Sequence, residues 1–403
     1  MAARYETQDL PAHLKLFAAL VADPAGAKRR VGATTTIDPE VYLSPARFGL
    51  ERDRLFRRYP VIVAHESELP EPGSLLAHDH LGVPILLARG RDGNIRAFLN
   101  ACRHRNTKLV KPGEEKKRAS IVCPYHSWTY GLDGRLLNIP CEDQFPGVEK
   151  GERGLAPLPC AVRSGLVFVV ADPAAKAAAS SESGHSVPAG SIDIDVFLAG
   201  LDVDFDAFGV GSSTMFRKVE QVKKTNWKLV VDAFQDGYHI QHLHRHTIAP
   251  FFKDCVSINE RTGDHLRAVV ARDTFDETAG LPPEQWNIRE HATYSHYVFP
   301  NSIFIMHPDY VSIIGLFPIS PGETLYSHRL LTPHAPRNEK ERDHYERSFD
   351  LIENGVFQAE DLDVSERAQA AMEGGAKWPM ALGAMETGIR MFHDILEEAL
   401  VRD

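Results

Sequence analysis

Short apolar runs separated by turn signals characterise the chain from about residue 45 to residue 170. The run Val83–Ala88 is apolar and Asn94–Phe98 alternates between apolar and polar positions, and Arg91-Asp92-Gly93 between them is a hairpin cue. A second cue, Asp133-Gly134, follows further along, and Gly165–Val170 has the length and composition of a buried strand. This half therefore predicts a small all-β domain.

The second half of the chain mixes two periodicities. Trp227–Leu243 has the spacing of one helix, and residues 389–400 place apolar side chains on one face of an amphipathic C-terminal helix. Several segments have the composition of strands of a single sheet: Phe216–Val222, Leu266–Ala271, Ile303–Met306, Val311–Phe317 and Leu325–Thr332. Strands combined with helices in this way predict an α+β domain with a helix packed across an antiparallel sheet.

A chain of 403 residues is too long for one typical core, so we expect two domains. The patterns predict an N-terminal helical arm over residues 1–40 and the all-β domain over 41–170. Residues 171–195 are rich in Ala, Ser, Pro and Gly and predict a linker or insertion, which leaves 196–403 as the second domain.

Charge and cysteine content narrow the function classes. The formal net charge is −10, which argues against binding to nucleic acid or to an anionic membrane. Five cysteines are an odd number and few for this length, so we expect no disulfide framework and a cytoplasmic location. We find no apolar run long enough to span a membrane and no export signal.

Two Cys/His pairs on separate loops form the first candidate metal site. Cys102 and His104 lie two residues apart, and Cys123 and His126 follow after an interval of eighteen residues. Structural zinc sites usually pair Cys with Cys or His with His at short spacing, so zinc is the weaker interpretation. One thiolate and one imidazole from each loop suit a Rieske [2Fe–2S] cluster, in which two Cys bind one iron and two His bind the other.

A second candidate site lies in a segment with four histidines, His239, His242, His244 and His246. Helical geometry alone favours His242 with His246, because residues four apart lie on one helix face. A mononuclear iron site with two histidines also needs a carboxylate and open coordination positions. The spacing by itself does not decide which histidines would serve.

These motifs resemble the α subunits of Rieske ring-hydroxylating oxygenases. The resemblance is carried by NACRHRNTKLV, by CPYHSWTYGLDGRLLNIP and by NWKLVVDAFQDGYHIQHLHRHT. It implies that His239 and His244 bind the mononuclear iron, and that His242 and His246 are neighbouring or surface residues. Within VFQAEDLDVSERAQ, Asp361 matches the third ligand best, and Asp363 and Glu360 lie close enough to remain alternatives.

The resemblance also implies a fold, a set of cofactors and an activity. The expected fold is α+β, with an N-terminal all-β Rieske domain and a C-terminal helix-grip catalytic domain. The expected cofactors are the [2Fe–2S] cluster and a mononuclear Fe(II), with electrons from NAD(P)H supplied through a separate reductase or ferredoxin. Asp236 would link His239 to His126 of the neighbouring subunit and couple electron transfer to proton position.

The implied activity is that of a terminal oxygenase, which uses O₂ to hydroxylate an aromatic or other hydrophobic small molecule, as in aromatic hydrocarbon catabolism. Oxidative demethylation of an N-methyl or O-methyl substrate is the alternative, and a non-catalytic electron carrier is the third interpretation. A head-to-tail homotrimer is expected, and whether a β subunit accompanies it stays open. Five side chains are candidate pocket wall: Phe234, Ile240, Phe304, Met306 and Phe357.

Overall fold

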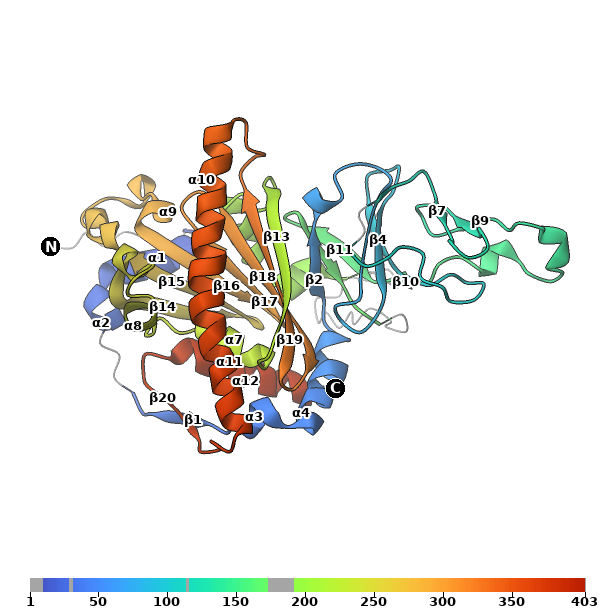
Figure 1. Ribbon diagram of the computed structural model, residues 1–403. Coiled ribbons are helices and arrows are strands. Elements are labelled where there is room, and N and C mark those ends of the chain that lie inside the picture. The colour runs from blue at the N-terminus through green and yellow to red at the C-terminus, as the bar shows by residue number, and fades with distance from the viewer. Residues whose placement is uncertain (1–9, 29–31, 114–115, 173–191, 403) are drawn as a thin grey trace. The chain divides into compact units, whose positions relative to one another are not determined.

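The computed structural model describes residues 10–28, 32–113, 116–172 and 192–402 (Figure 1). The chain forms two compact units, residues 53–197 and residues 1–52 together with 198–403. We call them the β unit and the catalytic unit and describe each by itself. Most of the predicted linker, residues 173–191, lies outside the described residues.

Three small antiparallel sheets build the β unit, as the pattern of short runs predicts. The predicted hairpins are confirmed: β4 pairs with β5 across a turn in which Gly93 has a φ of 83°, and β8 pairs with β9 across Gly134 at 85°. The five-stranded sheet runs β10 (Pro157–Leu158), β5 (Ile95–Leu99), β4 (Ile85–Arg89), β3 (Ser74–His78) and β6 (Lys116–Lys117). The others are β11 (Cys160–Arg163), β12 (Leu166–Val169) and β2 (Val61–His65), and β7 (Ile121–Val122), β8 (Thr129–Tyr130) and β9 (Leu136–Asn138).

A seven-stranded antiparallel sheet forms the centre of the catalytic unit (Figure 1). All five predicted strands are present, and two that were not predicted, β14 and β16, complete one side of the sheet. The strand order is β13 (Thr214–Lys223), β19 (Glu323–Thr332), β18 (Val311–Ser320), β17 (Ser302–Met306), β16 (Ala292–Val298), β15 (His265–Arg272) and β14 (Phe252–Thr262).

Helices cover this sheet, so the predicted α+β class is confirmed. The C-terminal helix α12 (Thr387–Val401) buries its apolar face and packs against β14 and β15, as its periodicity predicts. A long helical run that was not predicted crosses the sheet (Figure 1), and consists of α10 (Glu339–Asp350), the π-helical segment η9 (Leu351–Leu362) and α11 (Asp363–Glu373). The shorter helices are α6 (Leu201–Ala207), α7 (Trp227–Phe234), α8 (Ile240–Leu243) and α9 (Ile288–His291).

The N-terminal segment belongs to the catalytic unit, and this part of the unit extends to residue 52, beyond the boundary at residue 40 that the sequence pattern predicts. It comprises α1 (Ala12–Ala22), α2 (Pro24–Lys28), β1 (Thr35–Ile37), α3 (Glu40–Leu43) and α4 (Pro45–Glu51), and β1 pairs with β20 (Met380–Leu382). The sequence places the start of the β domain at residue 41, whereas contacts divide the units at residues 52 and 53. Polar contacts from α3 and α4 explain the difference.

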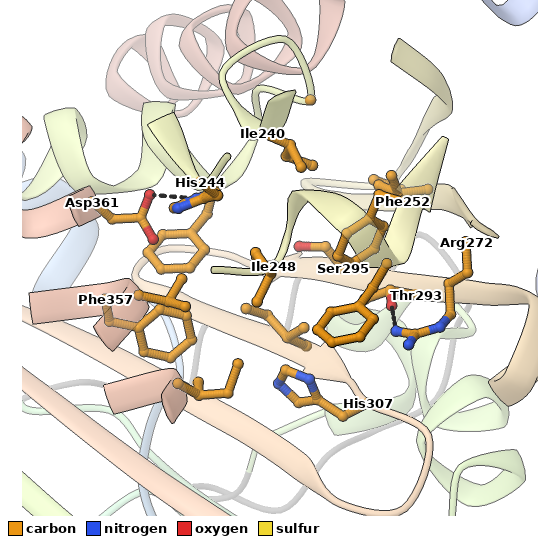
Figure 2. Close-up of a pocket in the computed structure, with 18 of the residues that line it drawn as sticks. Ile240, His244, Ile248, Phe252, Arg272, Thr293, Ser295, His307, Phe357 and Asp361 are labelled. Carbon is orange, nitrogen blue, oxygen red and sulfur yellow. Dashed lines mark hydrogen bonds and ion pairs between the residues drawn. The ribbon is translucent and has the colours of Figure 1, made fainter. Parts of the chain in front are cut away.

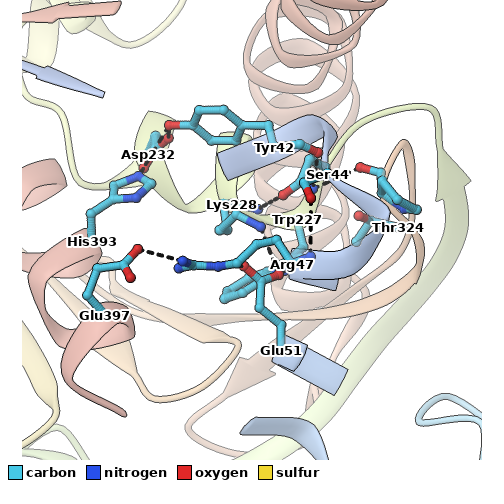
Figure 3. A network of polar contacts seen from close by, with 12 residues as sticks. Tyr42, Ser44, Arg47, Glu51, Trp227, Lys228, Asp232, Thr324, His393 and Glu397 are labelled. Atoms are coloured by element: carbon cyan, nitrogen blue, oxygen red, sulfur yellow. Dashed lines mark hydrogen bonds and ion pairs between the residues drawn. The ribbon is translucent and has the colours of Figure 1, made fainter. Parts of the chain in front are cut away.

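Figure 3 shows these contacts, which fix the helix α7. The buried carboxylate of Glu51 accepts hydrogen bonds from Lys228 Nζ at 2.8 Å and from Trp227 Nε1 at 3.1 Å. The Tyr42 hydroxyl donates to Asp232 at 2.6 Å. Burial and the Asp232 charge raise the pKa of Tyr42, so its hydroxyl stays a donor. Since α7 leads directly into the four-histidine segment, this network fixes the start of that segment.

No helix in the described part of the chain combines the length and the apolar character that crossing a membrane requires.

Candidate metal centres and substrate pocket

Two loops of the β unit bring the predicted cluster ligands together. Cys102 and Cys123 are 1% and 2% exposed and belong to one apolar cluster, and the rings of His104 and His126 lie 4.8 Å apart. In both loops the cysteine amide donates to a carbonyl five residues on, at 2.9 Å, and the cysteine carbonyl accepts from the amide four residues on. The two loops therefore have the same backbone conformation and present their ligands alike.

The side chains in these loops fit a Rieske cluster. His104 Nδ1 is buried and has no hydrogen-bond partner within the described part of the chain. The His104 ring stacks on Trp128 at 4.9 Å, and the Tyr130 hydroxyl lies 3.2 Å from Cys102 Sγ. Burial raises the pKa of Cys102, so its thiolate needs a cation nearby. Two buried sulfurs and an imidazole nitrogen without a partner suit a bound iron–sulfur cluster.

In the catalytic unit, His239, His244 and Asp361 converge on one point. The two Nε2 atoms lie 3.1 Å apart, and Asp361 Oδ1 lies 3.2 Å from His244 Nε2 and 3.6 Å from His239 Nε2. Although it is this close to both rings, the buried Asp361 Oδ1 makes no hydrogen bond among the described residues. Two imidazoles and one carboxylate that face a common point suit a non-haem Fe(II) with open positions.

The second nitrogen of each imidazole binds a carboxylate. His239 Nδ1 lies 3.3 Å from Asp236 Oδ2, and His244 Nδ1 lies 2.7 Å from Glu360 Oε2. Burial opposes protonation of His244, but Asp361 and Glu360 outweigh it and raise its pKa. Carboxylates in these positions fix the tautomer, so that each Nε2 lone pair is directed at the common point.

The alternatives that the sequence leaves open have different surroundings. The His242 ring packs against Tyr238 at 5.3 Å, and His246 Nε2 accepts from Arg245 at 2.9 Å. Asp363 forms an exposed ion pair with Arg367. Among the described residues, the group that could hold a metal consists of His239, His244 and Asp361. It does not include His242, His246 or Asp363.

The prediction of a single helix over Trp227–Leu243 is wrong, and the break positions the histidines. The helix α7 ends at Phe234, and α8 has four residues with His239 and His244 at its two ends. The side chain of Asp236 accepts a hydrogen bond from the Tyr238 amide at 2.6 Å, which competes with helical bonding. In an ideal helix a five-residue step would turn the two side chains about 140° apart. His239 and His244 can face one point because they flank α8, where the regular helix is broken on both sides.

A cavity of about 420 Å³ opens onto these three side chains and is lined mainly by apolar residues (Figure 2). Three of the predicted wall residues, Phe234, Ile240 and Phe357, line it. Phe304 and Met306 do not, because neighbours on a strand point to opposite faces; Ile305 lines the cavity and Phe304 stacks on Phe205. Further apolar lining comes from Ile248, Phe251, Phe252, Tyr310, Leu351, Ile352 and Val356.

A chain of buried polar groups ends at His307 in the cavity wall. His307 Nε2 lies 3.2 Å from Ser312 Oγ, which lies 3.0 Å from His328 Nε2, and His328 Nδ1 lies 2.8 Å from Glu353. Burial lowers the pKa of His307, so it presents a neutral ring to the cavity. No local motif in the sequence marks this network, because its members come from four separate elements.

Two further polar groups in the cavity wall were not predicted from the sequence. Arg272 stands at the end of β15, one residue after the predicted strand, and its Nη1 donates to Thr293 Oγ1 at 3.3 Å. The Gln235 side chain is buried, and neither of its amide atoms has a hydrogen bond within the described chain. Such groups usually have a partner, so the cavity offers polar contacts to a ligand or to water.

Family models match both units. The model for the Rieske [2Fe-2S] domain matches residues 59–159, and the model for the ring hydroxylating alpha subunit (catalytic domain) matches residues 207–401. The glycine betaine monooxygenase oxygenase subunit of Chromohalobacter salexigens is 32% identical over 232 residues, which are 57% of this chain and 48% of that protein. The carnitine monooxygenase oxygenase subunit of Escherichia coli K12 is 26% identical over 379 residues, 90% of this chain and 93% of that protein.

Among solved structures, naphthalene 1,2-dioxygenase from Rhodococcus sp. bound to indole matches with a TM-score of 0.72 and 20% identity, over 96% of this chain and 98% of that chain. This likeness shows a common fold. The two domain models are the types that carry a Rieske cluster and a mononuclear iron, in the same order as the two sites described above. The chain therefore belongs to the Rieske ring-hydroxylating oxygenase α-subunit family, and is an oxidoreductase of the terminal oxygenase type.

Proposed function

We propose that this terminal oxygenase binds its catalytic Fe(II) through His239, His244 and Asp361, and its cluster through Cys102, Cys123, His104 and His126. The observation that carries the proposal is the Asp361 carboxylate oxygen, which is buried beside two imidazole nitrogens without a hydrogen bond. Burying such a carboxylate is costly unless a cation occupies the point between the three groups. Bound Fe(II) would supply the activation of O₂.

The cavity favours a hydrophobic small molecule as substrate. Its volume of about 420 Å³ falls in the range of small-molecule sites, and aromatic and aliphatic side chains dominate its wall. Phe357 and Phe234 pack edge to face, with ring centroids 5.2 Å apart, and both line the cavity near the three ligands. We infer that these side chains hold an aromatic or other apolar substrate for hydroxylation and exclude bulk water from the reacting atoms.

Oxidative demethylation is the second candidate. The relatives named above include oxygenase subunits of glycine betaine and carnitine monooxygenases, and this favours a substrate with an N-methyl group. The products separate the two candidates: demethylation releases formaldehyde from the methyl group, whereas ring hydroxylation leaves every carbon in the product.

Metal analysis of the purified chain tests the proposal. We expect about three irons per chain with two acid-labile sulfides, and a loss of about one iron, with the visible cluster spectrum unchanged, when Asp361 is replaced by Ala. The matched control is Asp363→Ala, which removes an exposed acid two residues away and is expected to retain all the iron. Two irons with full redox activity would instead support an electron carrier, and zinc without sulfide would contradict both iron sites.

We also propose that Asp236 carries the coupling between subunits of a homotrimer, with electrons supplied by a separate reductase or ferredoxin. Asp236 is largely buried and already contacts His239 through Oδ2. Asp236→Ala is expected to keep both metals and lose turnover. The control Asp254→Ala, which removes an exposed acid of the same unit, should keep both metals and normal turnover. Normal turnover in the Asp236 variant would contradict the coupling. A solution mass of about 135 kDa, three times 44.9 kDa, would support the trimer.

A further inference from the structure

Arg272 brings a guanidinium group without a carboxylate partner into the cavity wall. Its contacts are the Thr293 hydroxyl at 3.3 Å and the faces of Phe251 and Phe252, whose centroids lie 5.9 and 5.5 Å from the guanidinium carbon. Among the described residues, no ion pair joins Arg272 to an acidic side chain. Burial lowers the pKa of Arg272, which shows that its charge is only partly solvated.

The same unit supplies partners to its other buried arginines. Arg267 binds the carboxylates of Asp204 and Glu260, each at 2.5 Å. Arg289 donates to the backbone carbonyls of His307, Phe208 and Tyr310 at 3.0 to 3.2 Å. Unlike these two arginines, Arg272 faces the cavity with one hydroxyl partner, so its guanidinium has donors left for a ligand.

A second polar group without a partner lies in the same cavity wall. The Ser295 hydroxyl is buried and has no hydrogen-bond partner within the described residues. Ser295 and Thr293 are alternate residues of β16, so both point from the same face of that strand, and both line the cavity. The register pairs Thr293 with Val270 and Ser295 with Ala268, so the Thr293 hydroxyl lies beside Arg272, and Ser295 lies further along the wall.

Arg272 and the metal ligands occupy opposite ends of the cavity. Figure 2 shows Arg272 and Thr293 on one side and His244 and Asp361 on the other, with Ser295 and Ile248 between them. The acid that lines the cavity from the neighbouring loop, Asp309, is paired with His344 at 2.6 Å. Asp273, the next residue in the chain, acts on Arg272 through its charge but makes no ion pair or hydrogen bond with it, so the guanidinium at this end keeps donors for a ligand.

We propose that the substrate has an apolar body and a carboxylate group, and that Arg272 and Thr293 bind this carboxylate while the apolar body extends toward His239, His244 and Asp361. The planar guanidinium fork matches a carboxylate in geometry as well as in charge. Anchoring one end of the molecule fixes which carbon lies beside the metal ligands. This inference rests on the proposed function, because it specifies the substrate class of the same cavity.

Matched pairs of compounds that differ only in charge test the inference. The pairs are benzoate and benzamide, 3-phenylpropionate and 3-phenylpropionamide, and 1-naphthoate and 1-naphthamide, and their dissociation constants are measured by titration calorimetry on the full, iron-loaded chain. In at least one pair the carboxylate is expected to bind about tenfold more tightly than the amide, the size of one charge-assisted hydrogen bond. Absence of a carboxylate preference in all pairs, weak or absent binding included, overturns the inference.

Variants locate the preference. In Arg272→Gln the carboxylate and the amide are expected to bind within about twofold of each other, and Thr293→Val should weaken the carboxylate while leaving the amide unchanged. The matched control is Lys253→Gln, which removes a positive charge that pairs with Asp276 and lies outside the cavity lining, and it should keep the wild-type preference. A preference that survives in Arg272→Gln overturns the inference. If Arg272→Gln does not fold, the wild-type pairs and Thr293→Val still decide it.

The outcomes for the two proposals are distinguishable. A chain that holds three irons and forms a hydroxylated product but binds amides as well as carboxylates refutes the anionic subsite alone. A chain that prefers carboxylates but holds no third iron refutes the proposed iron site alone.

Discussion

Replacing Glu360 by Gln is expected to weaken iron binding in the catalytic unit, because Glu360 acts on the metal only through His244. The Glu360 carboxylate is 16% exposed and accepts hydrogen bonds from His244 Nδ1 at 2.7 Å and from the Thr247 hydroxyl at 2.8 Å. The glutamine oxygen can keep one hydrogen bond, but the variant loses the negative charge that makes the imidazole a stronger base and holds its orientation.

The magnitude follows from comparable sites. Loss of a carboxylate that supports a metal-bound histidine typically costs 10- to 100-fold in metal affinity, which corresponds to about 1.4 to 2.8 kcal/mol. We expect Glu360→Gln near the lower limit, because the amide still fills the space and can accept one bond. Glu360→Ala should lie near the upper limit, because His244 Nδ1 and the Thr247 hydroxyl both lose their acceptor.

Competition with a chelator measures the effect. The full chain is titrated with a ferrous chelator, and the iron released is compared with the visible absorbance of the cluster, which is an internal reference in the same molecule. Asp363→Asn is the matched control, since its carboxylate lies on the same helical run and pairs with Arg367 at the surface. Unchanged iron affinity in Glu360→Gln, or an equal loss in Asp363→Asn, would refute the reasoning.

Two further predictions concern other parts of the chain. Tyr130→Phe removes the hydroxyl that lies 3.2 Å from Cys102 Sγ. This hydroxyl would stabilise the reduced, more negative cluster, so a redox titration of the variant should show a potential lower by about 20 to 60 mV. An unchanged potential would exclude this role. Asp204→Asn leaves the buried guanidinium of Arg267 with Glu260 as its remaining carboxylate partner, and it should lower the free energy of unfolding by about 1 to 3 kcal/mol in urea denaturation. Because the folded pKa of Asp204 is depressed, its stabilisation is present above the unfolded pKa of about 3.9 and declines as the pH falls below it, so wild type and variant should differ less at pH 3 than at pH 7.

Local chemistry explains which parts of the fold were predictable. The hairpins around Gly93 and Gly134 follow from residues that tolerate a positive φ, and the C-terminal helix follows from its apolar spacing. The strand β14 was not predicted because it is half-buried and rich in polar residues, and β16 was not predicted because it buries Thr and His. The long run from α10 to α11 was not predicted because α10 is strongly polar and exposes most of its surface.

The candidate site divides in the same way. The Cys/His loops are compact motifs, so spacing alone indicated a cluster, and the structure shows their ligand atoms together. The choice of His239 with His244 depended on resemblance, since ideal helical spacing favours His242 with His246. Arg272 and Ser295 could not be predicted, because a cavity formed by β15 and β16 exists only once distant segments have paired.

The β unit is an insertion in the sequence of the catalytic unit, because Tyr42 and Glu51, which precede it in the chain, contact α7, which follows it. The chain starts one folding unit, interrupts it after residue 52, and completes it from residue 198 onward. A fragment expressed from residue 198 would bury the Lys228 ammonium group without Glu51, and it would lack β1, the pairing partner of β20. An isolated oxygenase half should therefore require residues 10–52, supplied as a complementing peptide or fused to residue 198 through a short linker.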